Sequence, residues 1–337
     1  MATGVNEIKP FVVGVDIGGT NTVFGIVDAR GKILRSGSIK TGNHPIIEDF
    51  IDELAREILD LIDEEGGLEM IHGVGVGAPN ANFYTGTIDY AANLMWKGRI
   101  PFAHLLSNAL KGLPVALTND ANAAAIGEMT YGAARGMRDF IEITLGTGVG
   151  SGIVVGGKLV YGYDGFAGEL GHTTVRRNGR ICGCGRYGCL ETYCSATGVA
   201  RTAQEFLSAR EDDSLLRKIN PEEITSKDVF EAAMKGDKMA EEIFESTGEI
   251  LGEALANAVH FSSPEAIILF GGLTKAGKLI LEPTRKSLEA NLLPTFQGRV
   301  KLLVSDLSES DAAVLGASAL GWEATRDFLT KVTTDAE

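Results

Sequence analysis

Short apolar runs separated by turns dominate the beginning of the chain. Phe11–Asp16 is typical of a strand, and two further strands, Val23–Val27 and one from Ile33, follow turns that contain glycine. Apolar residues then recur at helical spacing from Ile47 to Ile62, and Gly66-Gly67 ends that helix. The pattern predicts a β-meander covered by an amphipathic helix.

The later part of the chain alternates between single strands and helices. A strand from Pro114 to Thr118 runs into Asn119-Asp120 and an alanine-rich helix, a junction from which side chains project into a cleft. Beyond the cysteines the pattern becomes mostly helical, with one strand at 266–270. Helices are expected at about 196–207, 226–234, 238–262 and 311–324.

Two segments resemble each other. Residues 11–32 and 140–158 share the order of apolar strand, Gly/Thr turn, apolar strand and Gly-Lys turn. The repeat predicts two related lobes that face each other. Counted from the first phenylalanine of each copy, Asp16 falls opposite Leu145, so only the first copy keeps a carboxylate at the end of its strand.

Size and charge narrow the class of protein. A chain of 337 residues is too long for one ordinary compact core and suits two lobes with a cleft between them. The net charge of −14 argues against nucleic acid as a partner, because such binding needs a basic face. A small polyphosphate is still allowed, because backbone N–H groups and Mg²⁺ can hold it.

The sequence has no signal-peptide pattern at its beginning and no apolar run of about 18 residues. We therefore expect a cytoplasmic protein without a membrane partner.

Two glycine-rich turns are candidates for binding phosphate. Asp16-Ile-Gly-Gly-Thr-Asn21 combines glycines that let a phosphate approach the backbone with hydroxyl and amide donors and a carboxylate that can position hydrated Mg²⁺. A tight hairpin alone explains it equally well. The second turn, Leu145–Gly152, favours the functional interpretation, because two such turns in a repeat can grip a polyphosphate from both sides. Neither turn is a Walker loop or a dinucleotide fingerprint.

Asp120 is the candidate general base. A carboxylate within hydrogen-bonding reach can accept the proton of a sugar hydroxyl during phosphoryl transfer. Asn119 or Asp120 could instead simply cap the helix that follows, and local sequence alone favours the cap. The two roles are compatible, with Asn119 orienting and Asp120 reacting.

A metal site is predicted around His172. All four cysteines fall between Cys182 and Cys194, and Cys182, Cys184 and Cys189 with His172 match the Cys₃His set of a structural zinc site. Cys194 is then a spare, packed thiol. Closing this loop would bring Glu169 and Glu191 to one cleft wall, where carboxylates can accept hydrogen bonds from sugar hydroxyls, and Asn93 could add an amide.

Taken together, these motifs resemble the ROK (repressor, open reading frame, kinase) group of actin-like sugar kinases. The similarity extends over nearly the whole chain. It rests on Asp16-Ile-Gly-Gly-Thr, Asn119-Asp-Ala-Asn, Leu145-Gly-Thr-Gly-Val-Gly, Glu169-Leu-Gly-His172, the segment from Cys182 to Glu191, and Gly271-Gly272.

The resemblance implies an α/β, two-lobed actin-like (ribonuclease H-like) ATPase fold with a cleft between lobes and a zinc-binding loop. It assigns the base to Asp120, and sugar contacts to Asn119, Glu169, His172 and Glu191, with His172 also ligating zinc. It places Gly272 at the adenosine. The nucleotide-binding set, taken with the turns above, is Asp16, Gly18, Gly19, Thr20, Asn21, Thr147, Gly148, Gly271 and Gly272. Asn80 departs from the family, which often has glycine after Pro79 of the substrate-side loop.

We expect a small lobe of residues 1–120 with a C-terminal helix at about 311–330, and a large lobe of residues 121–310 with the zinc loop at 172–189. The predicted reaction is ATP- and Mg²⁺-dependent phosphorylation of a hexose, D-glucose first. An N-acetylhexosamine (N-acetylmannosamine or N-acetylglucosamine) or fructose is the alternative substrate. A homodimer or homotetramer is implied. A non-catalytic sugar-sensing regulator is disfavoured, because only 15 residues precede Asp16 and both aspartates are present.

Overall fold

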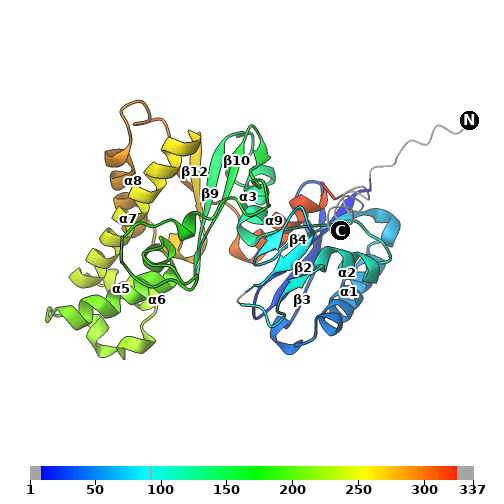
Figure 1. Cartoon of the computed structure of the whole chain (residues 1–337), viewed down its shortest axis with the longest axis horizontal. Helices are drawn as coiled ribbons and strands as arrows, with labels where there is room; N and C mark the ends of the chain where they lie inside the picture. The colour runs from blue at the N-terminus through cyan, green and yellow to red at the C-terminus, as the bar shows by residue number, and fades with distance from the viewer. Residues whose placement is uncertain (1–8, 92, 325–337) are drawn as a thin grey trace, which may run out of the picture. The chain divides into compact units, whose positions relative to one another are not determined.

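The computed structural model of the protein describes residues 9–91 and 93–324. Its contacts divide the chain into two compact units (Figure 1). Unit 1 consists of residues 1–135, 161–167 and 306–337, and unit 2 of residues 136–160 and 168–305. Each unit is therefore built from segments that are separated in the sequence.

Unit 1 is built on a five-stranded sheet. Its order is β3-β2-β1-β4-β8, in which β1, β2 and β3 form an antiparallel meander and β4 and β8 run parallel to β1. The predicted meander is thus confirmed. The strands are β1 (Phe11–Ile17), β2 (Thr22–Asp28), β3 (Ile33–Ile39), β4 (Ile71–Gly77) and β8 (Val115–Thr118).

Helices cover both faces of this sheet. The apolar stripe of α1 (Ile47–Glu64) packs with α2 (Phe102–Ala109) on one face, and the two helices lie side by side in Figure 1. On the other face α9 (Glu309–Gly321) contacts β1 and β4 and packs against α3 (Asp120–Thr130). A Cβ added at Gly75 would lie 1.9 Å from the carbonyl oxygen of Ala317, so glycine allows α9 to rest directly on the sheet.

Smaller elements complete unit 1. They are a three-stranded sheet of β5 (Ala81–Asn82), β6 (Thr87–Asp89) and β7 (Arg99–Ile100), and the 3₁₀ turns η1 (Thr41–Asn43) and η2 (Leu68–Met70).

Unit 2 repeats the sheet of unit 1. Its order is β11-β10-β9-β12-β13, again with an antiparallel meander and two parallel strands. The internal repeat read from the sequence is therefore a repeat of topology. The strands are β9 (Phe140–Leu145), β10 (Val149–Val155), β11 (Lys158–Leu159), β12 (Ala266–Phe270) and β13 (Lys301–Val304).

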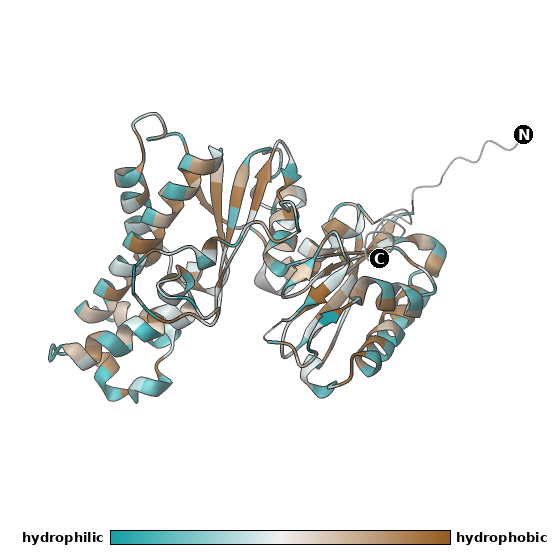
Figure 2. Cartoon of the chain, in the orientation of Figure 1, coloured by the Kyte–Doolittle hydropathy of each residue, from teal (hydrophilic) through white to brown (hydrophobic). Residues whose placement is uncertain are grey.

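The helices of unit 2 form one core with its sheet, and Figure 2 shows the apolar residues gathered in the strands and on helix faces. The two longest helices pack closely, with Gly248 of α7 against Pro283 of α8. The α-helices are α4 (Glu191–Cys194), α5 (Ala196–Ala209), α6 (Ser226–Ala233), α7 (Lys238–Ser262) and α8 (Lys278–Asn291). The 3₁₀ turns are η3 (Leu170–His172), η4 (Leu215–Lys218), η5 (Pro221–Glu223) and η6 (Gly272–Ala276).

Several details differ from the sequence-based expectation. Helices α2 and α8 and strand β13 were absent from it, and the last helix ends at Gly321 instead of Ala324. The boundary expected at residue 120 lies at Arg135, because α3 packs against α9 and so belongs to unit 1. Residues 325–330 of the expected C-terminal helix lie outside the described residues.

Among the residues that are described, every helix is too short or too polar to cross a bilayer.

Candidate active site

Two carboxylates meet at one edge of the sheet in unit 1. The register aligns Asp16 of β1 with Gly77 of β4, and Gly77 with Thr118 of β8, two residues before Asp120. A Cβ added at Gly77 would lie 3.5 Å from Oδ1 of Asp16 and 3.8 Å from Cα of Asp120. Because Gly77 has no side chain, both carboxylates share the space at this edge.

Their environment favours the protonated forms. Burial, followed by the charge of Asp120, raises the pKa of Asp16 to about 7. Loss of hydration also raises the pKa of Asp120, and the backbone N–H of Ala121 opposes that shift. The Asp120 side chain is itself exposed, so water limits its shift. Perturbed carboxyls at a sheet edge are typical of functional sites.

Asn119 and Asp120 divide the capping role. Asn119 is the N-cap of α3, and its Oδ1 accepts a hydrogen bond from the backbone N–H of Asn122 at 2.7 Å. Oδ1 of Asp120 accepts from the N–H of Ala121 at 2.9 Å. The cap predicted from local sequence is therefore present, with Asn119 in the N-cap position.

The first glycine-rich turn connects β1 to β2. The N–H of Gly18 donates to the carbonyl of Asn21 at 3.0 Å, which closes the turn. A Cβ added at Gly19 would lie 2.6 Å from the carbonyl oxygen of Asn93, so Asn93 packs against the turn. Thr20 and Asn21 are exposed and offer their polar groups outward. The turn has the open, donor-rich surface that a phosphate requires.

The corresponding turn of unit 2 is held by neighbouring helices. The N–H of Ala196 donates to the carbonyl of Gly146, and the hydroxyl of Thr197 to the carbonyl of Thr147, both at 2.8 Å. A Cβ at Gly148 would lie 2.6 Å from Oε2 of Glu191. Gly271 has φ of 100° and lies against the end of β9. Thr147, Gly148, Glu191 and Gly271, with Gly272 next in the chain, therefore lie around one sheet edge.

The segment Glu169-Leu-Gly-His172 packs against β10. A Cβ at Gly171 would lie 1.9 Å from the carbonyl oxygen of Val149, so this contact requires glycine. His172 lies between two carboxylates: its Nε2 is 4.0 Å from Glu169, and its Nδ1 is 3.7 Å from Glu191. The structure thus brings together the three unit 2 residues predicted to contact a sugar.

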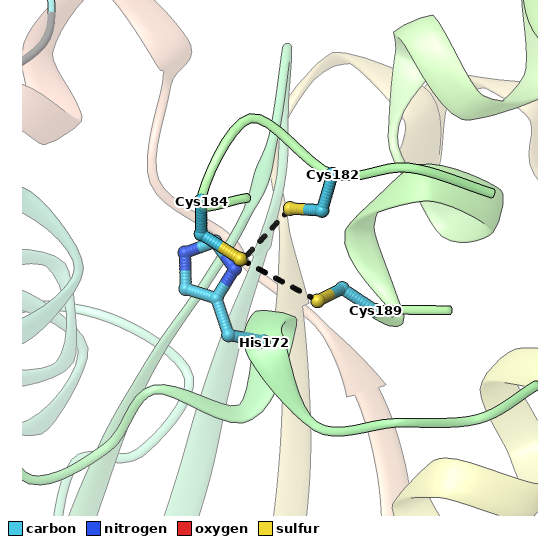
Figure 3. A group of neighbouring side chains, drawn as sticks. All are labelled: His172, Cys182, Cys184 and Cys189. Carbon is cyan, nitrogen blue, oxygen red and sulfur yellow. Dashed lines mark hydrogen bonds between the residues drawn. The ribbon is translucent and has the colours of Figure 1, made fainter. Parts of the chain in front are cut away.

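The predicted metal ligands converge. Ligand atoms of His172, Cys182, Cys184 and Cys189 all lie within 4.8 Å of one another, and Figure 3 shows them turned toward a common point. Sγ of Cys182 lies 3.6 Å from Nδ1 of His172, and Sγ of Cys184 lies 3.7 Å from Sγ of Cys189. Zinc–sulfur bonds of about 2.3 Å give a tetrahedral edge of about 3.8 Å, so the residues fit zinc. Cys194 is fully buried in the core of unit 2, as a packed thiol should be.

Arg180 secures the loop that carries these cysteines, a role that the sequence did not reveal. Its buried guanidinium donates to the carbonyls of Thr192 and Gly198 and forms an ion pair with the exposed carboxylate of Glu205. It also lies over the ring of Tyr193. The cysteine loop is thereby joined to α4 and α5, which also hold Glu191 and the second glycine-rich turn.

Residues 161–167 form a second feature that the sequence did not reveal. They belong to unit 1 although the segments on both sides of them belong to unit 2. Nδ2 of Asn82 donates to the carbonyl of Asp164 at 2.6 Å, and the rings of Phe83 and Tyr161 stack with centroids 3.9 Å apart. Gly162 and Gly165, both with positive φ, were the only local hint of this loop.

Two units that repeat one sheet, each with a glycine-rich hairpin at the sheet edge, and a carboxylate pair in one of them, define an actin-like phosphotransferase. The sequence profile of the ROK family matches residues 12–324, and the chain belongs to that family. The two-lobed, actin-like fold class predicted from the sequence is therefore confirmed.

Individual relatives agree with this assignment. A glucokinase of Halalkalibacterium halodurans is 38% identical over 92% of this chain and 93% of its own length. The crystal structure of a ROK family glucokinase from Streptomyces griseus, in complex with glucose and AMPPNP, superposes with a TM-score of 0.77. That protein is 35% identical, and the match covers 93% of this chain and all of the other.

Regulators of the same family are also similar. A xylose repressor of Caldicellulosiruptor bescii is 30% identical over 94% of this chain and 79% of its own length. Family membership alone therefore leaves a choice between catalysis and sugar sensing.

Proposed function

We propose that the protein is an ATP-dependent hexose kinase that phosphorylates D-glucose at its 6-hydroxyl. The observation that carries the proposal is the pair of carboxylates, Asp16 and Asp120, at the sheet edge of unit 1. The glucokinases among its relatives support glucose as the substrate. The two carboxylates support catalysis over sensing alone.

In the proposed reaction Asp120 accepts the proton of the sugar hydroxyl. The hydroxyl oxygen forms a bond to the γ-phosphorus of ATP, while the bond from that phosphorus to the β,γ-bridging oxygen breaks and ADP leaves. Asp16 positions Mg²⁺, which neutralises charge on the phosphates. The nucleotide-binding groups are Gly18, Gly19, Thr20 and Asn21 of the first turn, Thr147 and Gly148 of the second, and Gly271 and Gly272.

Sugar binding is proposed for the residues that offer acceptors and amides beside these turns. They are Asn93, Asn119 and Asp120 of unit 1, and Glu169, His172 and Glu191 of unit 2. Zinc held by His172, Cys182, Cys184 and Cys189 would fix the position of the imidazole between the carboxylates of Glu169 and Glu191. With four protein ligands, zinc would be structural.

An ADP-release assay with and without Mg²⁺ tests the proposal. Glucose, mannose, fructose, N-acetylglucosamine and N-acetylmannosamine should each be offered with ATP. We expect Mg²⁺-dependent turnover with glucose preferred. Preference for an N-acetylhexosamine or for fructose would keep the kinase and correct its substrate.

Sugar sensing without catalysis is the second candidate, and the similarity to the xylose repressor favours it. It predicts measurable sugar binding by calorimetry, with no ADP release in the presence of any of these sugars.

The same samples, run on a sizing column with light scattering, test the proposed homodimer or homotetramer. Fractionation of the cells that make the protein tests the proposed cytoplasmic location.

A further inference from the structure

The proposed phosphate contacts contain no basic side chain. The set taken from the two turns and from Gly271-Gly272 offers backbone N–H groups, hydroxyls, one amide and one carboxylate. In phosphoryl transfer enzymes a lysine or arginine commonly contacts the phosphates in addition to the metal ion, because the negative charge of the transferred group must be neutralised. A cation beside one of these turns would complete the site, and the following inference rests on the proposed kinase function.

Lys40 lies at the first turn. Its Nζ donates to Oδ1 of Asn21 at 2.8 Å, directly after Thr20 of the predicted phosphate loop. The strand register explains this proximity, because Ile39 at the end of β3 pairs with Thr22 at the start of β2. The two strands are antiparallel, so Asn21, which precedes Thr22, lies beside Lys40, which follows Ile39.

Buried contacts hold the backbone on both sides of Lys40. The hydroxyls of Thr22 and Thr41 are hydrogen-bonded at 2.8 Å, and these residues are only 0% and 2% exposed. A Cβ built at Gly42 would lie 4.0 Å from the carbonyl oxygen of Gly19. The 3₁₀ turn η1 therefore lies along the glycine-rich turn, and the root of the lysine side chain is fixed beside it.

The ammonium group of Lys40 is free to bind a ligand. Arg35, on the same strand, is engaged by Glu64 and Glu65 at 3.1 Å each. In residues 9–91 and 93–324, by contrast, no carboxylate pairs with Lys40, which is exposed and bonded to the neutral amide of Asn21. An ammonium group has three N–H donors, so one bond to Asn21 leaves two for another acceptor.

We propose that Lys40 is a phosphate-contacting catalytic residue, oriented by Asn21 and donating to non-bridging oxygens of the γ-phosphoryl group. It takes no part in proton transfer: the sugar proton goes to Asp120, the bond from the γ-phosphorus to the leaving ADP breaks, and Lys40 balances negative charge on the transferred phosphoryl group. Its ligand is the polyphosphate of a nucleotide. The sugar is bound without it.

The test compares K40M and K40R with K32M. Lys32 is an equally exposed lysine of the turn at the other end of the β2–β3 hairpin, which makes it a matched control. For K40M we expect kcat with glucose to fall about 10- to 100-fold, with K40R recovering part of the loss and K32M unchanged. Because Lys40 is exposed, all three variants should keep the melting temperature of the parent protein.

Binding supplies the readout that is independent of turnover. Calorimetry with Mg²⁺-AMPPNP should show weaker affinity for K40M, with the loss reduced for Mg²⁺-ADP, which lacks the γ-group. Glucose affinity without nucleotide should stay unchanged. Both kcat and AMPPNP affinity of K40M within about twofold of the parent values would overturn the proposal. A parent protein without kinase activity would instead refute the proposed function, and the AMPPNP comparison would still decide the role of Lys40.

Discussion

The hairpins β1–β2 and β9–β10 occupy the same place in two sheets of the same order, yet their turns are built differently. In unit 1 the strand before the turn, β1, carries the half-buried carboxylate Asp16 one residue before its end at the buried Ile17. In unit 2 the strand ends with the fully buried Leu145. Only the first of these two strands therefore carries a carboxylate at its end, whereas the second turn has the carboxylate of Glu191, from another element, beside it.

The support behind each turn differs as well. The first is backed by main chain of its own unit, at Asn93 and beside Lys40. The second is bonded to the start of α5 and touches Glu191, close to the cysteine loop. The two copies of one sheet can thus carry different functional groups. In the proposed kinase, unit 1 would supply the base and the charge at the phosphates, and unit 2 the cysteine cluster with the carboxylates beside it.

The largest effect should come from Asp120→Asn. The asparagine can still accept the bond from the N–H of Ala121, so the protein should fold, but it cannot take the sugar proton. We expect kcat to fall by at least about two orders of magnitude, while glucose affinity by calorimetry changes little. Asp63→Asn, an exposed carboxylate of α1, is the control. Near-normal turnover in the Asp120 variant would remove that residue from the role of base.

The next effect should arise in unit 2, from Cys184→Ala. With one of four proposed ligands removed, the protein should lose zinc and stability together. Metal analysis of the parent protein should give one zinc per chain, and the variant much less, with a lower melting temperature. Cys194→Ala, which alters a buried thiol outside the cluster, should keep its zinc. Full zinc content in the Cys184 variant would contradict the ligand set.

Alanine substitutions at two glycines compare a tightly packed position in unit 1 with an open position in unit 2. The methyl group of Gly75→Ala would collide with the backbone of α9 at Ala317 and Gly321, and we expect a loss of about 1–3 kcal/mol in unfolding free energy. A Cβ at Gly146 meets no atom within 4 Å. Gly146→Ala should therefore change stability by less than about 0.5 kcal/mol. Denaturant unfolding measures both, and equal losses would show that α9 can shift at little cost.

The smallest effect is a pH dependence specific to unit 1. The pKa of Asp16 in the folded protein, about 7, lies above its ordinary value of 3.8, so the folded state binds this proton more tightly than the unfolded state. Its stabilising contribution is complete below about pH 4 and is lost as the pH rises through about 7. In Mg²⁺-free buffer, the melting temperature of Asp16→Asn should come closest to that of the parent near about pH 4 and exceed it by a growing margin as the pH rises to about 8. A difference that stays constant with pH would contradict this origin.

Local patterns accounted for much of the fold. The meander, the helix covering it and the long helix α7 follow from apolar spacing and turn residues, which act over a few positions. Helix α8 was missed, since Pro283 interrupts it and many of its residues are polar. Its stability comes from packing against α7, and no local signal reports such a contact.

Some residues of the candidate site likewise have a local sequence signal, and others do not. Asp120 and the cysteine cluster could be proposed from sequence, because base, cap and metal ligands have characteristic neighbours or spacing. Lys40 could not, because its proximity to Asn21 depends on strand register. Loop 161–167 could not either, because its partners Asn82 and Phe83 lie far away in the chain.

The position of α9 bears on how the protein is made. The strands of the unit 1 sheet are synthesised before unit 2, but the helix that rests on Gly14 and Gly75 is synthesised after it. One face of its sheet therefore stays uncovered while residues 136–305 emerge. Unit 2, translated later, has its full set of strands and helices first. The nascent chain should thus depend on chaperones most strongly before α9 emerges, since exposed strands invite misassociation.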